Sequence, residues 1–134
     1  MEITKELIKI FASWTKLKIR IHAVEEILAI PQAREIWWVN LGQNIGVETN
    51  GKSDNFERPV VVIKVFNYHC SLVAPISSTI KEDQYLIEFM TGEDKRSTIN
   101  MSQLRSLSHK RFIRKMGELN YEDFSKIKKI LHAF

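Results

Sequence analysis

Between Pro31 and Asn120 the chain consists of short apolar runs separated by turn residues, and no long helical pattern interrupts them. The predicted strands cover residues 35–41, 58–66, 70–76, 84–89 and 97–101, with a further short one at 105–107. The second and third of these form a predicted hairpin with its turn near Asn67. Strands that follow one another without crossover helices favour an antiparallel sheet or small barrel over βαβ units.

Helical patterns are expected at the two ends of the chain. Before Pro31, apolar residues recur in alternating steps of four and three, which predicts one long helix or two joined helices. This stripe contains Ile3, Leu7, Ile10, Trp14, Leu17, Ile21, Val24 and Leu28. It would pack either on the body of the protein or on another chain. Near the C-terminus, Asn120 is a suitable N-cap for a helix that reaches about His132.

The predicted fold class is therefore α+β, with two parts. Residues 1–31 form a helical extension, and residues 32–134 form the main domain. A chain of 134 residues, 44% hydrophobic and 27% charged, is suited to one globular domain with such a short accessory element.

Charge permits an anionic partner without requiring one, because the net charge is only +4. The stretch from Arg105 to Lys115 is basic and contains no acidic residue. Such a stretch is either a solvated face or a surface that contacts nucleic acid. Both readings stay open from the sequence.

Several classes of protein are disfavoured by what the sequence lacks. The single cysteine, Cys70, rules out an internal disulfide and indicates a reducing compartment. The four histidines have no metal-ligand spacing, and no P-loop, GxSxG or GxGxxG motif occurs. No signal-peptide core and no membrane-spanning apolar run are found. We therefore expect a cytoplasmic protein with no metal, no cofactor and no membrane association.

Three side chains fall at the ends of predicted elements, where a rigid scaffold presents functional groups. Arg58 begins one strand, Ser77 ends the next, and Glu48 lies in the long loop before them. A guanidinium and a hydroxyl suit phosphate oxygens, and together they can support attack on RNA by its own 2′-OH. Each residue also has an ordinary explanation: a solvated glutamate, a strand entry beside Pro59 and a turn serine.

The sequence resembles PemK/MazF-like toxins of bacterial toxin-antitoxin systems over about residues 34–133. The matching motifs occur in the order of the family: EIWWVNLGQNIGVE at 35–48, Gly51-Lys52, RPVVVI at 58–63, APISS at 74–78, SQLR at 102–105, Lys110-Arg111-Phe112 and Lys115-Met116-Gly117. This resemblance implies a small SH3-like antiparallel β-barrel with added helices. It also implies a homodimer, ribosome-independent and sequence-specific cleavage of single-stranded RNA, and an antitoxin that covers the RNA groove.

The resemblance also implies roles for particular residues. It assigns the catalytic arginine to Arg58, the catalytic hydroxyl to Ser77, the loop glutamate to Glu48 and a base-contacting glutamine to Gln103. The sequence departs from the family pattern at Ser77, where threonine is common, and at Arg34, where glycine is frequent. The loop over residues 52–57 is longer than in the shortest members, which bears on RNA sequence preference.

The expected reaction is a metal-independent transesterification that leaves a 2′,3′-cyclic phosphate and a 5′-OH. Arginine does not readily give up a proton, so Glu48 is the better acceptor for the 2′-OH hydrogen if its loop folds close to Arg58. The predicted walls of the RNA groove are the basic stretch from Arg105 to Lys115 and the loop that carries Asn50, Lys52 and Phe56. The expected RNA-binding residues are Asn50, Lys52, Phe56, Gln103 and Arg105.

Some alternatives remain open from the sequence. Phe56 either stacks on an unpaired base or packs under its own loop. Trp37 and Trp38 point to opposite faces of their strand, so one is expected in the core and the other at a dimer interface. The protein could also be a non-catalytic toxin of the same barrel class, such as a gyrase inhibitor, or a weak family member that binds RNA without cutting it.

Overall fold

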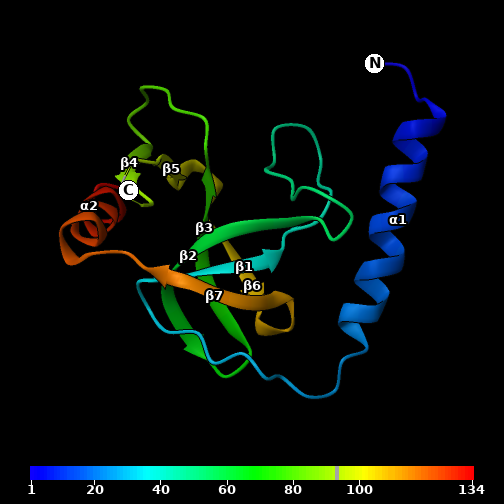
Figure 1. The fold of residues 1–134 in the computed structure, drawn as a ribbon, viewed down its shortest axis with the longest axis horizontal. Coiled ribbons are helices and arrows are strands. Elements are labelled where there is room, and N and C mark those ends of the chain that lie inside the picture. The colour runs from blue at the N-terminus through cyan, green and yellow to red at the C-terminus, as the bar shows by residue number, and fades with distance from the viewer. Residues whose placement is uncertain (93) are drawn as a thin grey trace.

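The computed structural model describes residues 1–92 and 94–134, and it has the predicted α+β class (Figure 1). A seven-stranded antiparallel sheet lies between two helices that are far apart in the sequence. The elements are α1 (Lys5–His22), β1 (Glu35–Asn40), β2 (Glu57–Asn67), β3 (Cys70–Ser77), β4 (Leu86–Met90), β5 (Arg96–Asn100), β6 (Arg105–Ser108), β7 (Phe112–Glu118) and α2 (Tyr121–His132). Short 3₁₀ helices cover Met101–Gln103 and His109–Arg111.

The strand order is β4-β5-β3-β2-β1-β7. The remaining strand, β6, pairs with the N-terminal half of β3. β3 therefore pairs with three strands, because its N-terminal half meets β6, its C-terminal end meets β5 and β2 runs along its other edge. In the described part of the chain the terminal strands β4 and β7 do not pair with each other. The sheet is thus an SH3-like barrel that is not fully closed.

Both faces of β2 are buried, which explains its continuous apolar run. Because side chains alternate along a strand, Val61 and Ile63 join one core cluster while Val60 and Val62 join another. α2 adds Phe124 and Ile127 to the first cluster. Asn120 caps this helix as predicted, since its side-chain oxygen accepts a hydrogen bond from the Asp123 N–H.

The N-terminal helix is shorter than the apolar stripe predicts. α1 ends at His22, so the prediction of helix through Val24 to Leu28 is wrong. The following residues bind the barrel instead: the Ile27 carbonyl accepts a hydrogen bond from the Tyr68 hydroxyl at 2.9 Å, and Ala29 packs on the second core cluster. Tertiary contacts have overridden the local helical pattern here.

β7 is the strand that the sequence pattern did not predict. It occupies the C-terminal half of the basic stretch, and of its seven residues only Phe112 is buried. The strand pairs with β1 through two irregularities of register, between Ile36 and Trp37 and between Trp38 and Val39. An exposed edge strand with bulges lacks the period of two that identifies a half-buried strand.

Arg34 takes a backbone conformation that normally favours glycine, with φ of 78°. Its side chain makes contacts that a glycine could not: Nε donates to the Leu119 carbonyl at 3.1 Å, and the guanidinium lies 3.7 Å from the centre of the Tyr121 ring. These contacts tie the start of β1 to the start of α2 and offset the strain of the left-handed backbone.

Candidate active site

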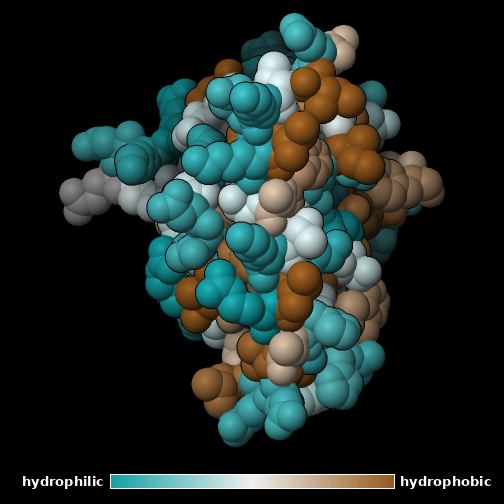
Figure 2. Space-filling view, turned by 90° about the vertical axis from the view of Figure 1, so that its right-hand side faces the viewer, coloured by the Kyte–Doolittle hydropathy of each residue, from teal (hydrophilic) through white to brown (hydrophobic). Residues whose placement is uncertain are grey.

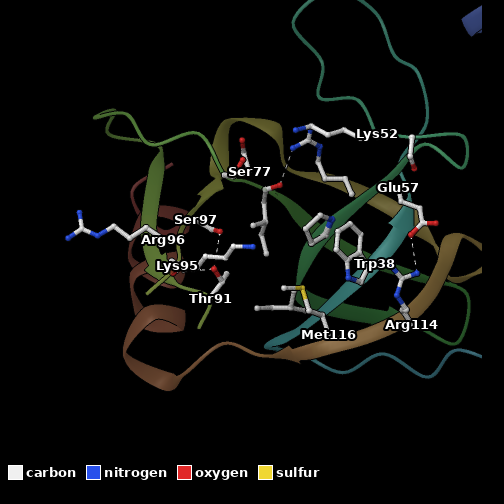
Figure 3. A pocket seen from close by; sticks show the side chains of 16 residues that line it. Trp38, Lys52, Glu57, Ser77, Thr91, Lys95, Arg96, Ser97, Arg114 and Met116 are labelled. Carbon is white, nitrogen blue, oxygen red and sulfur yellow. Dashed lines mark hydrogen bonds and ion pairs between the residues drawn. The ribbon is translucent and has the colours of Figure 1, made fainter. Parts of the chain in front are cut away.

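Arg58 and Ser77 line one hollow of about 720 Å³ on the surface of the sheet. We call it the Arg58 hollow. Its floor and walls come from β1, β2, β3 and β7, with Trp38 and Met116 among the apolar residues (Figure 3). Besides Arg58, the basic residues that line it are Lys52, Lys95, Arg96 and Arg114. Figure 3 shows Lys95 directed toward the centre of this hollow and Arg96 directed away from it.

Two backbone carbonyls hold the Arg58 guanidinium in place. Nε donates to the Asn50 carbonyl at 2.5 Å, and Nη1 donates to the Ile76 carbonyl at 3.1 Å. A guanidinium has five N–H donors, and the residues that the structure describes accept two of them. Three donors are therefore left for a ligand. Burial lowers the pKa of Arg58, but arginine titrates so far above neutral pH that the cation persists.

Ser77 is the last residue of β3, where it pairs with Thr98 of β5. Its Oγ accepts a hydrogen bond from the Thr79 N–H at 3.1 Å, which leaves the hydroxyl hydrogen available to donate. The preceding residue, Ile76, supplies the carbonyl that holds Arg58. One short segment of β3 therefore positions both the cation and the hydroxyl.

Glu48 does not line the Arg58 hollow. It lines a second hollow of about 730 Å³ together with Gln103 and Arg105, which we call the Glu48 hollow. Its Oε1 accepts a hydrogen bond from the Ile45 N–H at 2.8 Å within the same loop. Glu48 and Arg58 therefore line different hollows, whereas the expected proton transfer needs them in one site.

Among the residues that the structure describes, Glu57 is the carboxylate that lines the Arg58 hollow. Its Oε1 forms an ion pair with Arg114 of β7 at 3.0 Å, and Arg114 also lies 5.0 Å from the centre of the Trp38 ring. Trp38 therefore lines the hollow instead of entering the core. Sequence reasoning overlooked Glu57 although it directly precedes Arg58. It missed Trp38 and Arg114 because they reach the hollow only through the pairing of β1 with β2 and β7, and β7 was not predicted.

The predicted RNA-binding residues divide between the two hollows. Lys52 lines the Arg58 hollow and is exposed, whereas Arg105 lines the Glu48 hollow. Asn50 lies between them: its carbonyl holds Arg58, and its side-chain oxygen accepts a hydrogen bond from the Asn44 N–H at 2.5 Å. Its side chain is thus already engaged in the loop.

Gln103 and Phe56 are both engaged with the loop over residues 41–56, which connects β1 to β2. The Gln103 side chain accepts a hydrogen bond from the Thr49 N–H at 3.1 Å and donates to the Val47 carbonyl at 3.2 Å. The Phe56 ring is buried and lies 5.5 Å from the Trp14 ring of α1. The structure therefore has Phe56 in the packed arrangement, and Phe56 lines neither the Arg58 hollow nor the Glu48 hollow.

Two further observations concern metal ligands and membrane-spanning helices. No three side chains of His, Cys, Asp or Glu come together as a metal site in residues 1–92 and 94–134. Within the same residues, no helix is both long and apolar enough to cross a membrane.

The fold and the Arg58 hollow define a small α+β protein whose partly open barrel carries a cationic hollow at one edge of the β2–β3 pair. The family model described as "PemK-like, MazF-like toxin of type II toxin-antitoxin system" matches residues 32–134. Because this range is more than half of the chain, the protein belongs to that family. No curated protein matches the chain at a significant level.

Solved structures of toxins share this fold at low sequence identity. MazF from Deinococcus radiodurans is 18% identical with a TM-score of 0.67, and the match covers 78% of this chain and 96% of that one. Mycobacterium tuberculosis toxin MazF-mt6 is 15% identical with a TM-score of 0.58, over 75% and 94% of the two chains. An endoribonuclease from Mycobacterial species, in complex with its cognate antitoxin, is 10% identical with a TM-score of 0.57, over 77% and 90%.

Proposed function

We propose that this protein is a sequence-specific, metal-independent endoribonuclease that cleaves single-stranded RNA as the toxin of a toxin-antitoxin pair. The observation that carries the proposal is the Arg58 hollow, in which a carbonyl-held guanidinium and a serine hydroxyl share one cationic cavity. Membership of the toxin family and the likeness in fold to a protein described as an endoribonuclease support the same reading. The toxin domain would comprise residues 32–134, preceded by an extension over residues 1–31.

In the proposed reaction the 2′-oxygen of one nucleotide forms a bond to the adjacent phosphorus while the bond from phosphorus to the 5′-oxygen breaks. The products are a 2′,3′-cyclic phosphate and a 5′-OH. The free donors of Arg58 would stabilise the charge that develops on the non-bridging oxygens, an effect of about 3 to 4 kcal/mol per donor. The Ser77 hydroxyl would donate to one of these oxygens and fix the phosphate.

We assign removal of the 2′-OH proton to Glu57, which lines the same hollow as Arg58. A general base must lie within hydrogen-bond reach of the proton that it takes. Glu48 was the sequence-based choice, and its position in the other hollow makes it the weaker candidate. It is better suited to hold its own loop, through its bond to the Ile45 N–H.

The two hollows lie on either side of residues 49–52, so we propose that the RNA strand crosses this segment. Lys52 would contact phosphates in the Arg58 hollow, and Arg105 would do so in the Glu48 hollow. Asn50 and Gln103 would contact bases after exchanging their present bonds to the loop. Phe56 would take no part, because its ring is buried against Trp14.

The proposed partners are a cognate antitoxin and a second copy of the chain. A protein segment that occupies the Arg58 hollow would compete directly with RNA. The structural relative solved with its antitoxin supports such an inhibitor as the partner class. A mass measurement in solution, with and without a co-expressed antitoxin, tests both the homodimer and the complex.

The deciding experiment incubates long single-stranded RNA with the purified protein in EDTA and maps the new 5′ ends. We expect cuts at one recurring short sequence by the wild type and none by Arg58→Ala of equal thermal stability. Full activity in Arg58→Ala would overturn the assignment of the site. No cleavage by the wild type would instead favour a non-catalytic toxin of this barrel class, such as a gyrase inhibitor, or an RNA-binding module.

A further inference from the structure

α1 buries one side chain fully against the rest of the protein. Trp14 is the only buried residue of this helix, with 6% of its surface exposed. Figure 1 shows α1 standing beside the 41–56 loop, and Figure 2, viewed from that side, shows hydrophobic and hydrophilic side chains intermingled over this face. The family match begins at residue 32, so the proposed function has given this helix no role.

The Trp14 ring lies directly over the backbone of Gly42. A Cβ atom built at Gly42 would come within 2.4 Å of the ring, and the φ of 94° at this position also favours glycine. The ring further contacts Phe56, at 5.5 Å between centres, and lies 5.6 Å from the Arg111 guanidinium. Trp14 thus packs on both ends of the 41–56 loop, at its second residue and at its last.

From these two ends, hydrogen bonds lead to Arg58. The Phe56 carbonyl accepts from the Gly42 N–H at 3.2 Å, and the Gly42 carbonyl accepts from the Gly51 N–H at 2.8 Å. Gly51 is so close to the Phe56 backbone that a Cβ there would lie 1.8 Å from its carbonyl oxygen. The residue before Gly51 is Asn50, whose carbonyl accepts the Arg58 Nε–H.

The same loop holds backbone conformations that need support. Ser53 has φ of 64° and Phe56 has φ of 50°, both in the left-handed region that L-residues rarely adopt. Such conformations persist only where the surrounding packing holds them. The Trp14 ring supplies that packing for Phe56.

We propose that Trp14 is a positioning residue for the Arg58 site and that α1 acts as a brace for the 41–56 loop. By covering Gly42 and Phe56, the ring fixes the Asn50 carbonyl, and that carbonyl orients the Arg58 guanidinium toward the hollow. The expected loss of cleavage rests on the proposed ribonuclease function, whereas the expected effect of Trp14 on the orientation of Arg58 does not.

The kinetic test compares Trp14→Ala with Trp14→Phe and with Ile19→Ala, a control on the same helix whose side chain is 63% exposed. We expect Trp14→Ala to lower kcat about 10- to 100-fold with a smaller change in KM, because a misplaced catalytic group costs about this much. Trp14→Phe should recover most of the rate, and Ile19→Ala should retain all of it. Equal kcat in wild type and Trp14→Ala would overturn the proposal.

A readout that needs no RNA is the hydrogen exchange of the Arg58 Nε–H, followed by NMR and assigned through its loss in Arg58→Lys. We expect slow exchange in the wild type, at least tenfold faster exchange in Trp14→Ala, and wild-type exchange in Ile19→Ala. Unchanged exchange in folded Trp14→Ala would reject the brace. If Trp14→Ala does not fold, Trp14→Leu keeps apolar bulk without the flat ring and carries the same expectation. A wild type that cuts no RNA would refute the ribonuclease and leave this test intact.

Discussion

Two partly buried arginines, Arg58 and Arg111, both donate to the 41–56 loop and differ in what surrounds them. Burial lowers the pKa of both, and both donate to two backbone carbonyls. The Arg111 guanidinium donates to the Asn40 and Leu41 carbonyls and faces the Trp14 ring in a cavity of about 150 Å³. Arg58 faces the hollow of about 720 Å³ that it shares with Ser77.

The comparison teaches that burial and carbonyl bonding alone do not identify a functional arginine. In both places the carbonyls fix the guanidinium, but the hollow beside Arg58 is much larger than the cavity beside Arg111 and gives more room for a phosphate. We therefore expect Arg111 to contribute to stability and Arg58 to catalysis. The following predictions, in order of decreasing effect, test this difference.

The largest expected effect is that of Arg58→Ala on cleavage. Loss of the charge that stabilises the phosphorane should slow cleavage about 10³-fold, with little change in the melting temperature. Arg111→Ala should do the opposite: it removes the hydrogen bonds to the Asn40 and Leu41 carbonyls, lowers the melting temperature and reduces cleavage far less. Cleavage rates and thermal unfolding of the two variants, measured side by side, would break the comparison if the effects were equal or reversed.

Glu57→Gln should slow cleavage about 10²-fold, because it removes the proposed proton acceptor while keeping a similar shape. The matched control is Glu48→Gln, which changes a carboxylate in the other hollow and should have a smaller effect. Single-turnover rates over a range of pH distinguish the two, since loss of the base also removes the acidic limb of the profile. A larger effect of Glu48→Gln would return the base to the loop glutamate.

Ser77→Ala should slow cleavage about tenfold, the cost of one hydrogen bond to a charged oxygen. Ser77→Thr should remain active, because threonine keeps the hydroxyl at the end of β3. Rates measured on one RNA sequence suffice for both variants. If Ser77→Thr were as slow as Ser77→Ala, the hydroxyl would not be the group that matters.

The smallest expected effect is that of pH on the stability of the fold. It concerns His109, which lies in the same short 3₁₀ helix as Arg111. Burial lowers the pKa of His109, whose ring nitrogens lie 2.7 Å from the Ser71 hydroxyl and 2.7 Å from the Tyr68 carbonyl. The folded chain therefore binds this proton less readily than the unfolded chain. Stability should be fully present above about pH 6.5 and should fall as the pH decreases from there toward the lower folded pKa.

Thermal unfolding between pH 7 and pH 5 measures this effect. The fall should become shallower in His109→Gln and persist in His132→Gln, which changes an exposed histidine. A wild type whose stability does not change over this range would show that His109 has no such role.

The strands with a clear apolar signal could be predicted from the sequence, and β2 with β3 is the best example. Their hairpin brings the ends of both strands to one place, so the proximity of Arg58 to Ser77 followed from chain order alone. β7 escaped prediction because a bulged edge strand with six unburied residues carries no period. The helix beyond His22 was predicted wrongly because contacts with Tyr68 and the core outweigh its periodic stripe.

The parts of the site that depend on long-range pairing could not be predicted. Trp38 reaches the Arg58 hollow only because β1 pairs with β2, and Arg114 reaches Glu57 there only because β7 pairs with β1. The course of a long polar loop is equally hidden, so the sequence left open whether the loop brings Glu48 close to Arg58, and the structure has Glu48 in the other hollow. Trp14 looked like one more member of a helical stripe, and nothing in the pattern distinguished it from its apolar neighbours.

The most direct test of the central claim uses an RNA with one 2′-deoxy nucleotide on the 5′ side of the mapped cut. The account has the substrate's own 2′-oxygen attack the phosphorus within the Arg58 hollow. It therefore predicts that cleavage at this position stops while the modified RNA still binds and competes with the unmodified strand. Continued cutting at the deoxy position would show that another nucleophile does the chemistry and would contradict the account.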